Sequence, residues 1–243
     1  MKAVLLAGGK GRRLAPYTTI LPKPLMPIGD QPILEIVIRQ LAHAGFNDIT
    51  LAVGYLAELI KAYFGDGSKF GVQLKYSHEE VPLGTAGPIS LVPDIKDTFL
   101  VMNGDLLTTL DYAALLSYHH ARGAVATVTA YTREVKIDLG VIHSDADNWL
   151  SDYVEKPTYT YDVSTGIYVF EPSIVSYIPF GKRLDLPDLL LNLRQRGEKV
   201  NIYKFAGYWL DIGHPADYEK AVQEFEDHRT RFLPQNLPSF SNE

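Results

Sequence analysis

The first thirty residues combine glycines with basic side chains directly after a short apolar run, a combination suited to binding phosphate. Residues 2–7 are typical of a strand, and Gly8, Gly9 and Gly11 follow in the next turn. Glycine lets a backbone approach a ligand closely, and successive amides in such a turn form an anion-binding nest. This stretch has a net charge of +4 in a chain of net charge −6, from Lys2, Lys10, Arg12, Arg13 and Lys23 against Asp30. We therefore expect a phosphate site where the first strand ends.

The turn does not match the common nucleotide-binding loops. The dinucleotide fingerprint G-x-G-x-x-G fails at its third glycine, where Leu14 stands. No acidic residue ends the second strand to hold a ribose, because that strand ends at Val53-Gly54-Tyr55. The Walker A pattern G-x-x-x-x-G-K-[ST] does not occur. The plain alternative is an ordinary strand-to-helix turn whose basic side chains are solvated.

Strands and helices alternate through residues 1–123, which predicts an α/β fold with a doubly wound, mostly parallel sheet. We expect helices at 31–44, capped by Asp30, and at 57–64, 111–122 and 186–196, with strands at 2–7, 49–53, 72–76, 97–102 and 200–205. Such sheets bind ligands outside the carboxyl ends of their strands. The opening turn, the glycine-rich turn 84–88 and Asp105 all lie at such ends, so they can line one cleft.

The second half contains strand-like segments separated by short polar turns, at 124–133, 138–144, 149–155 and 164–171. We expect one domain over residues 1–227, made of the halves 1–123 and 124–227. A last helix follows 209–213, and residues 228–243 are expected to form a frayed tail. His119 and His120, late in an amphipathic helix, are predicted to lie on the surface.

Composition narrows the class of protein. Hydrophobic content of 46% and charged content of 21% are typical of a globular domain. The absence of cysteine excludes disulfides, thiolate nucleophiles and Cys-based zinc sites. A pI near 5.6 argues against a nucleic-acid partner. No apolar run approaches the roughly twenty residues that span a bilayer, so we expect a cytoplasmic protein with no membrane partner.

The opening residues LAGGKGRRLAPYTTILPKPLMPI resemble the signature of the sugar-phosphate nucleotidyltransferases, L-A-G-G-x-G-x-R-L-x-P-x-T-x-x-x-P-K-P. Every fixed position of that signature is met. The resemblance continues in the family's order through LGTAGP, NGD at 103–105, EKP at 155–157, GIYVF from Gly166 and WLDIG from Trp209. It covers residues 1–226 and implies a Rossmann-like nucleotidyltransferase fold with a mixed sheet. In that fold residues 1–123 would be the nucleotide-binding half and residues 124–227 the sugar-phosphate-binding half.

The resemblance implies that an oxygen of a sugar 1-phosphate attacks the α-phosphorus of a nucleoside triphosphate, releasing pyrophosphate. Two anionic reactants must be brought into line, so catalysis consists of positioning and of cations that stabilise the leaving group. By this likeness Arg13 would hold the leaving phosphates with its forked donors, and Lys23 would neutralise phosphate oxygens at the reacting centre. Asp105 and Asp211 would be the oxygen ligands of Mg²⁺.

The same resemblance assigns the binding residues. Lys156 would bind the sugar phosphate and Glu155 the sugar hydroxyls. The nucleotide would be bound by Leu6, Ala7, Gly8, Gly9, Gly11, Gly84, Thr85 and Gly87. The sugar phosphate would be bound by Gly140, Glu155, Lys156, Thr165 and Gly166. The partners implied are a nucleoside triphosphate and a sugar 1-phosphate, with a homo-oligomer open. Taken singly, Asp211 could equally cap the following helix and Lys156 could be solvated.

Departures from the family pattern concern the substrates. Ser164-Thr165 stands where relatives often have an asparagine for a sugar hydroxyl. The turn Gly84-Thr85-Ala86-Gly87-Pro88 is similar to that of mannose-1-phosphate guanylyltransferases, whereas thymidylyltransferases often have G-L-A-Q. GTP and mannose 1-phosphate are therefore the expected substrates, with uridylyl or thymidylyl transfer to glucose 1-phosphate or another sugar 1-phosphate as the alternative. The left-handed β-helix that often follows in those guanylyltransferases is not expected within this sequence.

Two other classes remain as alternatives. A non-catalytic subunit that senses nucleotide sugars would be expected to lack one or more of Arg13, Lys23, Asp105 and Asp211, and all four are present. A Rossmann dehydrogenase is disfavoured by the missing third glycine and the missing ribose acid.

Overall fold

The structure is a computed structural model that describes residues 1–233, and a seven-stranded sheet in the order β12-β8-β11-β6-β1-β4-β5 forms its centre. All neighbouring strands run parallel except β11, which is antiparallel to both β6 and β8. The sheet strands are β1 (Lys2–Ala7), β4 (Asp48–Val53), β5 (Gln73–His78), β6 (Phe99–Asn103), β8 (Ala126–Lys136), β11 (Thr158–Phe170) and β12 (Val200–Phe205). The prediction of a mixed, mostly parallel sheet is confirmed.

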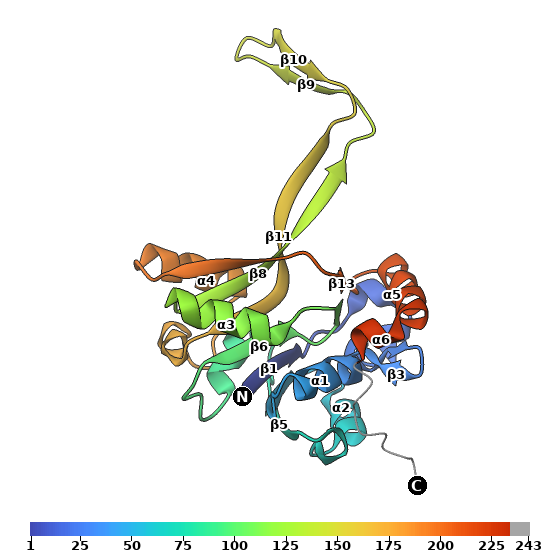
Figure 1. Cartoon of the computed structure of the whole chain (residues 1–243), viewed down its shortest axis with the longest axis vertical. Coiled ribbons are helices and arrows are strands. Elements are labelled where there is room, and N and C mark those ends of the chain that lie inside the picture. The colour runs from blue at the N-terminus through green and yellow to red at the C-terminus, as the bar shows by residue number, and fades with distance from the viewer. Residues whose placement is uncertain (234–243) are drawn as a thin grey trace.

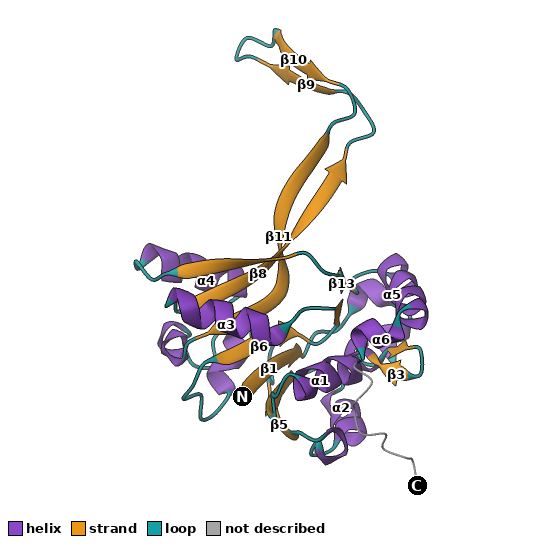
Figure 2. Cartoon of the chain, viewed as in Figure 1, coloured by secondary structure: helices purple, strands orange, loops and turns teal. Residues whose placement is uncertain are grey.

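Helices cover both faces of the sheet, as Figures 1 and 2 show. The α-helices are α1 (Ile33–His43), α2 (Ala57–Phe64), α3 (Tyr112–Arg122), α4 (Leu186–Gln195), α5 (Pro215–Asp227) and α6 (Arg229–Phe232). Leu5 of β1 packs in the core under α1, α2 and α3, whereas the adjacent Val4 packs in the core under α4. Alternating side chains of one central strand therefore serve both faces, as a doubly wound sheet requires. None of the helices within residues 1–233 has the length and hydrophobicity to span a bilayer.

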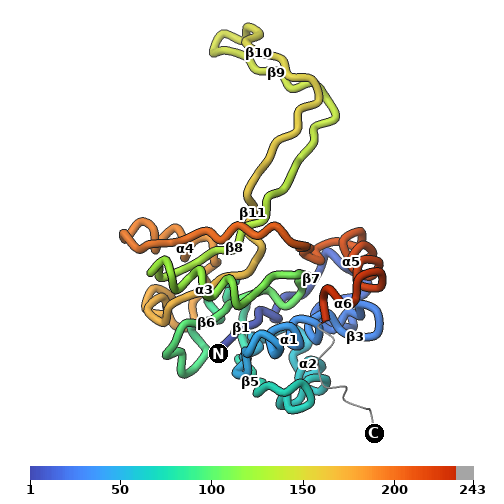
Figure 3. The backbone as a smooth tube through the Cα atoms, viewed as in Figure 1, coloured from blue at the N-terminus to red at the C-terminus, as the bar shows by residue number. Residues whose placement is uncertain are grey.

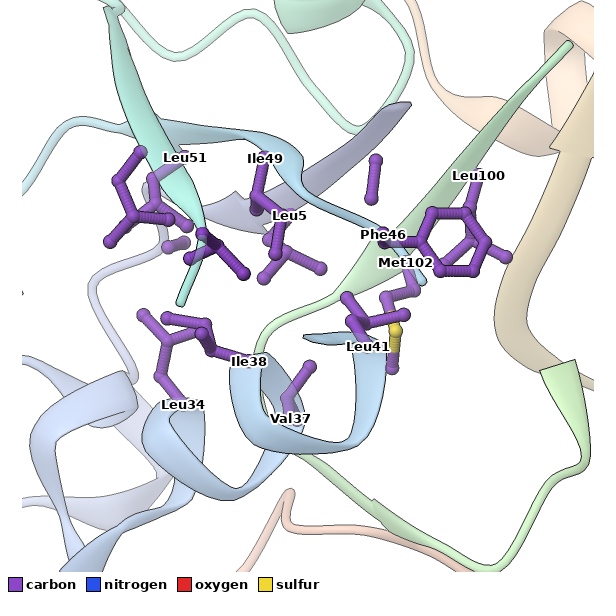
Figure 4. Close-up of a cluster of buried hydrophobic side chains, with 14 of the residues drawn as sticks. Leu5, Leu34, Val37, Ile38, Leu41, Phe46, Ile49, Leu51, Leu100 and Met102 are labelled. Atoms are coloured by element: carbon purple, nitrogen blue, oxygen red, sulfur yellow. The ribbon is translucent and has the colours of Figure 1, made fainter. Parts of the chain in front are cut away.

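Helix α1 forms because its apolar residues repeat at helical spacing. Leu34, Val37, Ile38 and Leu41 are fully buried against β1, β4 and β6 (Figure 4). Burying each such side chain contributes roughly 1.5–3 kcal/mol, so this face anchors the helix under the sheet. The expected cap at Asp30 is wrong, because Asp30 instead forms an ion pair with Arg229.

The helix begins two residues later than expected because residues 31–32 pair as a strand. Short strands β2 (Pro27–Ile28) and β3 (Gln31–Pro32) form a hairpin, and Pro32 becomes the residue before the helix. A second small pair, β7 (Leu106–Thr108) with β13 (Trp209–Asp211), brings the segment after β6 beside the segment before α5. This pairing connects the two halves of the chain at the edge where the sheet strands end.

The prediction that His119 lies on the surface is wrong. His119 is 1% exposed, its Nδ1 lies 2.8 Å from Thr127 Oγ1, and its Nε2 lies 3.0 Å from Glu171 Oε1. Burial lowers the pKa of this imidazole, and the adjacent Glu171 carboxylate opposes that effect. The polar side chain is tolerated inside because both ring nitrogens have partners.

The C-terminal segment is more ordered than the expected tail. Residues 228–233 include α6, and Phe232 is fully buried against Phe225 and Tyr208. The carbonyl of Phe232 also accepts a 2.9 Å hydrogen bond from Gln40 of α1. The rest of the expected tail, residues 234–243, lies outside the described residues. The division into halves at residue 123 stays a prediction, since one sheet takes strands from both.

Residues 133–162, called the arm below, project from the body (Figure 1). β8 and β11 extend beyond the sheet as a two-stranded ladder, paired from Ala130↔Ser164 to Lys136↔Thr158. The arm ends in a separate hairpin of β9 (Val141–Ser144) and β10 (Leu150–Val154). The sequence indicates these strands but not that they leave the body.

Candidate active site

Three loops meet at one edge of the sheet because β1 lies between β4 and β6 with all three strands parallel. The register places Ala7 beside Val53 and Leu6 beside Asn103. The opening turn, Gly54 and the segment 103–105 therefore emerge side by side. The connections that follow β1 and its two neighbours diverge and leave a crevice at this edge. This is the usual position of a ligand in such sheets.

The crevice is a cavity of about 820 Å³. Its lining includes six of the eight residues predicted to bind the nucleotide: Leu6, Gly8, Gly9, Gly11, Gly84 and Thr85. A Cβ at position 8 would overlap Oε1 of Glu79, which explains why glycine stands there. No atom lies within 4 Å of where a Cβ on Gly9 would stand, so the backbone faces open space there. A ligand can therefore approach the main chain of this turn closely.

The second glycine-rich turn is held by the segment before α4. Gly84 has φ of +78° and lies against Leu184 and Asp185. The amide of Thr85 donates to Asp185 Oδ1 at 3.1 Å, and the amide of Leu186 donates to Thr85 Oγ1 at 2.7 Å. Gly87 is buried and packs on the carbonyl of Lys182 behind the cavity. Gly87 thus positions the turn and does not line the cavity.

A smaller cavity of about 290 Å³ adjoins the first and shares Leu6, Gly9, Gly11, Arg12 and Asp105 with it. Its own lining adds Ala7, Arg13, Lys23 and Gly213. Lys23 and Asp105 form an ion pair in which their side chains are 12% and 20% exposed. The other carboxylate oxygen of Asp105, Oδ1, is buried and has no hydrogen-bond partner among residues 1–233.

Asp211 lies beside Asp105 because β13 pairs with β7. Asp211 is paired with Leu106, and the amide of Ile212 donates to the carbonyl of Asp105 at 3.3 Å. Burial raises the pKa of the Asp211 carboxyl, and the neighbouring Asp105 carboxylate raises it further. Lys23 and Arg13 oppose this shift. Two acidic side chains from distant parts of the sequence therefore share one poorly solvated position.

This arrangement fits a divalent cation. An unpartnered carboxylate oxygen beside a carboxyl whose charge is disfavoured calls for added positive charge. Within residues 1–233 no group of three or more His, Cys, Asp or Glu side chains surrounds the position. Magnesium commonly uses one or two carboxylates and takes its remaining ligands from phosphates and water. Asp105 and Asp211 are therefore suited to hold it jointly with a bound triphosphate.

Arg13 lies on the other side of the smaller cavity, where its guanidinium packs against Gly213. Its Nη1 is 3.4 Å from Nε2 of His214, the residue before α5. The side chain is exposed, so its remaining donors are free to contact an anion that enters the cavity. The WLDIG segment thus places Asp211, Gly213 and His214 beside the opening turn.

The residues predicted to bind the sugar phosphate are not brought together. Gly166 packs against the Asn103 side chain, and Asn103 lines the larger cavity. Thr165 is 1% exposed and its hydroxyl donates to the carbonyl of Thr129 at 3.0 Å, so that hydroxyl is not available to a ligand. The remaining three, Gly140, Glu155 and Lys156, lie on the arm. Neither cavity is lined by a described residue of the arm.

Several residues of the cleft were missed from the sequence. Glu79 and Glu80 follow β5 and line the larger cavity, and Asn103 and Tyr55 also line it. Their position at the ends of β5, β6 and β4 was an available signal, because neighbouring parallel strands end at the same edge. His214 follows the WLDIG motif directly, and this adjacency is the signal that could have found it.

Comparison with known proteins gives relatives of one kind. The chain is 37% identical to UTP--glucose-1-phosphate uridylyltransferase of Synechocystis, over 92% of this chain and 63% of the relative. It is 36% identical to mannose-1-phosphate guanyltransferase of Yarrowia lipolytica, over 90% of this chain and 62% of the relative. Among solved structures, a protein assigned as a glucose-1-phosphate thymidylyltransferase from Bacillus anthracis, solved with sucrose, superposes with a TM-score of 0.76. It is 25% identical and the match covers 93% of this chain and 96% of that one.

The chain thus spans a little over three fifths of the length of these two curated relatives. Their names specify different bases and sugars, so the likeness alone does not select a substrate. A family model described as "Nucleotidyl transferase" matches residues 2–228, nearly the whole described chain. The chain therefore belongs to the sugar-phosphate nucleotidyltransferase family that its opening motif resembles.

Proposed function

We propose that the protein transfers a guanylyl group from GTP to mannose 1-phosphate, giving GDP-mannose and pyrophosphate, with Mg²⁺ as cofactor. The observation that carries the reaction class is the cluster of Lys23, Asp105 and Asp211 where the glycine turn meets the smaller cavity. Lys23 supplies a cation, and Asp105 and Asp211 supply oxygen ligands for a metal, next to a backbone that can bind phosphates. The same cluster argues against a non-catalytic subunit, which has no need of these side chains.

In the proposed reaction a phosphate oxygen of the sugar 1-phosphate attacks the α-phosphorus of the triphosphate. A bond forms between that oxygen and phosphorus, and the bond to the bridging oxygen breaks with its electron pair leaving on pyrophosphate. The sugar phosphate is already ionised at neutral pH, so no base is needed. The amides of residues 8–11 bind the triphosphate, and Arg13 holds the departing phosphates.

Lys23 changes partner as the substrate binds in this scheme. In the structure its ammonium is neutralised by Asp105. Phosphate oxygens entering the smaller cavity compete for that ammonium, and charge developing on the leaving group strengthens their hold. Bound Mg²⁺ supplies further positive charge to the phosphate oxygens. The side chains themselves undergo no covalent change, so catalysis rests on alignment and electrostatics.

Glu79 is the residue that favours guanine. Its Oε2 accepts a 2.8 Å hydrogen bond from the amide of Leu83, and its Oε1 lies over Gly8 in the cavity wall. An ionised carboxylate accepts hydrogen bonds only. The N1–H and N2–H₂ groups of guanine are two adjacent donors that match it, whereas uracil and thymine place carbonyl oxygens on both sides of a single N–H. Adenine offers one donor beside an acceptor. Guanine is therefore the best match.

The choice of mannose 1-phosphate as the sugar substrate rests on similarity to other proteins. The turn Gly84–Pro88 is similar to that of mannose-1-phosphate guanylyltransferases, and the Yarrowia relative bears that name. The second candidate is uridylyl transfer to glucose 1-phosphate, which the Synechocystis relative favours at 37% identity. The difference between them is set by the base-facing wall and by the groups that contact the sugar.

A matrix of four nucleoside triphosphates against several sugar 1-phosphates, with Mg²⁺, tests the proposal through pyrophosphate release. The highest kcat/KM is expected for GTP with mannose 1-phosphate. If UTP with glucose 1-phosphate gives the highest value, the second candidate replaces the first. If no pair releases pyrophosphate above the Mg²⁺-free control, the reaction class itself is wrong.

A further inference from the structure

The arm is a stiff projection rather than a loose loop. Its stem is the continuous β8–β11 ladder, and the tube in Figure 3 shows the two strands running together away from the body to the β9–β10 tip. Folding the arm back onto its own body would require breaking ladder pairs between 130–136 and 158–164. The stem therefore holds the tip at a distance from the cleft of the same chain.

The tip of the arm exposes apolar side chains that a solvated hairpin does not need. Of the exposed large hydrophobic residues within 1–233, eight of seventeen lie between 135 and 161. Leu139, Ile142, Trp149 and Leu150 are 75%, 65%, 73% and 68% exposed. A lone two-stranded hairpin has no core, and contiguous exposed apolar surface marks an interface. The exposed apolar side chains of the tip therefore favour contact with another protein surface.

The arm also carries an ordered polar group. Tyr153 donates a 3.1 Å hydrogen bond to Glu155 Oε2. A Cβ at position 140 would overlap the Tyr153 hydroxyl, so glycine is the residue that fits there. Lys156 has φ of +46°, a backbone conformation that residues other than glycine rarely adopt. Its ammonium lies 4.0 Å from Glu155 Oε1, and among residues 1–233 it forms no other ion pair. Such backbone strain is typically retained where a side chain must be aimed at a ligand.

The opening segment, residues 1–30, and the arm have opposite net charges. Residues 133–162 contain seven acidic and three basic residues, a net charge of −4, whereas residues 1–30 have a net charge of +4. The inference rests on the proposed function at one point: a sugar 1-phosphate adds a second anion to a cleft whose Lys23 and Arg13 already serve the triphosphate. The missing cation and hydroxyl acceptor are present on the arm as Lys156 and Glu155.

We propose that the arm of one chain docks over the cleft of a second copy, in a reciprocal two-fold exchange. Each cleft would then bind nucleotide with its own residues and sugar 1-phosphate with Glu155 and Lys156 from the other copy. The exchange buries both apolar tips, pairs an acidic arm with a basic turn, and satisfies the self-complementarity of a two-fold dimer. Neither site is complete in a single chain.

A heterodimer of two inactive chains tests the exchange. Asp105→Asn disables the cleft of one chain and Lys156→Ala disables the arm of the other, and two affinity tags isolate the mixed dimer after co-expression. Exchange predicts about half the wild-type rate, because one of the two clefts then has both parts intact. The same pair is expected to be inactive if each arm serves its own cleft, which would overturn the proposal. Lys136→Ala, an exposed lysine on the same arm, is the matched control and should retain wild-type rates.

Light scattering separates this inference from the proposed reaction. The wild-type chain is expected to be a dimer, and Trp149→Ser with Leu150→Ser is expected to give a folded monomer with the circular dichroism of the wild type. A wild-type monomer at assay concentration overturns the exchange whatever the activity. A wild-type dimer that the tip substitutions dissociate, but that releases no pyrophosphate from any substrate pair, supports the exchange and overturns the proposed function.

Discussion

Lys23 forms an ion pair with Asp105, so the cation that the opening motif contributes is neutralised by the acid that follows β6. The pair is largely shielded from solvent, so the Coulomb attraction between its two charges is screened less than in a surface pair. Substrate phosphates and a metal ion can separate the two residues, each taking one partner. The contact therefore neutralises the Lys23 ammonium when the cleft is empty and provides two opposite charges when the substrate arrives.

Removing the ammonium of Lys23 tests its role. We expect Lys23→Ala to lower kcat by about 10²- to 10³-fold, the usual effect of deleting one group that stabilises charge in a transition state. Pyrophosphate release measures the rate, and thermal unfolding checks the fold. Lys61→Ala is the matched control, because Lys61 is a partly exposed lysine on α2 whose single ion pair within residues 1–233 is with Glu58. A kcat within about threefold of wild type would remove Lys23 from the mechanism.

The base preference should change with Glu79. In Glu79→Gln one amide oxygen can still accept from Leu83, while the NH₂ group then faces the base and suits a carbonyl of uracil. We expect kcat/KM for GTP to fall about 10- to 100-fold relative to UTP, because the variant loses the acceptor that faces the guanine donors. Parallel kinetics with both nucleotides give the ratio.

Glu58→Gln, at a side chain of α2 that is 83% exposed, should leave that ratio unchanged. Equal losses for GTP and UTP in Glu79→Gln would mean that Glu79 shapes the cavity without reading the base.

The core elements could be predicted from the sequence because their signals are local. The helix 57–64 and the strand 200–205 have the expected bounds, since apolar spacing and flanking glycines determine them. His119 was misplaced because its burial depends on Thr127 and Glu171, which come from β8 and from the segment after β11. Side-chain partners far away in the sequence are not visible in a helical pattern.

In the candidate site, too, features within one segment could be predicted from the sequence, whereas contacts between distant segments could not. The glycine turn is one continuous segment, so its motif fixes both residue types and geometry. Asp211 could be expected from its motif, but its position beside Asp105 follows from the β7–β13 pairing. The EKP motif at 155–157 gives the chemistry of Lys156 without its location, because the length and direction of the arm depend on how far β8 and β11 remain paired.

Phe232 should be important for stability although it lies in the segment expected to fray. The side chain is fully buried between Phe225 and Tyr208, so Phe232→Ala removes a large apolar group and leaves a cavity. We expect the free energy of unfolding to fall by about 3–5 kcal/mol, measured by urea denaturation. Phe180→Ala, at a side chain 77% exposed, serves as the control. A loss below about 1 kcal/mol in Phe232→Ala would show that this segment is not docked in solution.

Asp211 should make the metal-free protein less stable as the pH rises. Its folded-state pKa is raised above the ordinary value of 3.8, by burial first and then by Asp105. The folded state therefore holds this proton more tightly than the unfolded state, and the resulting stabilisation is present below pH 3.8 and lost as the pH rises through the raised pKa. Asp211→Asn mimics the protonated form, so without metal its Tm should equal that of the wild type in acid and exceed it at neutral pH.

Added Mg²⁺ should raise the Tm of the wild type at pH 7 and leave the Tm of Asp211→Asn nearly unchanged, because the variant lacks one of the two carboxylates. Equal responses of the two proteins to Mg²⁺ would mean that Asp211 does not hold the metal, and a wild-type Tm above that of the variant at neutral pH without metal would mean that its carboxylate is stabilised in another way.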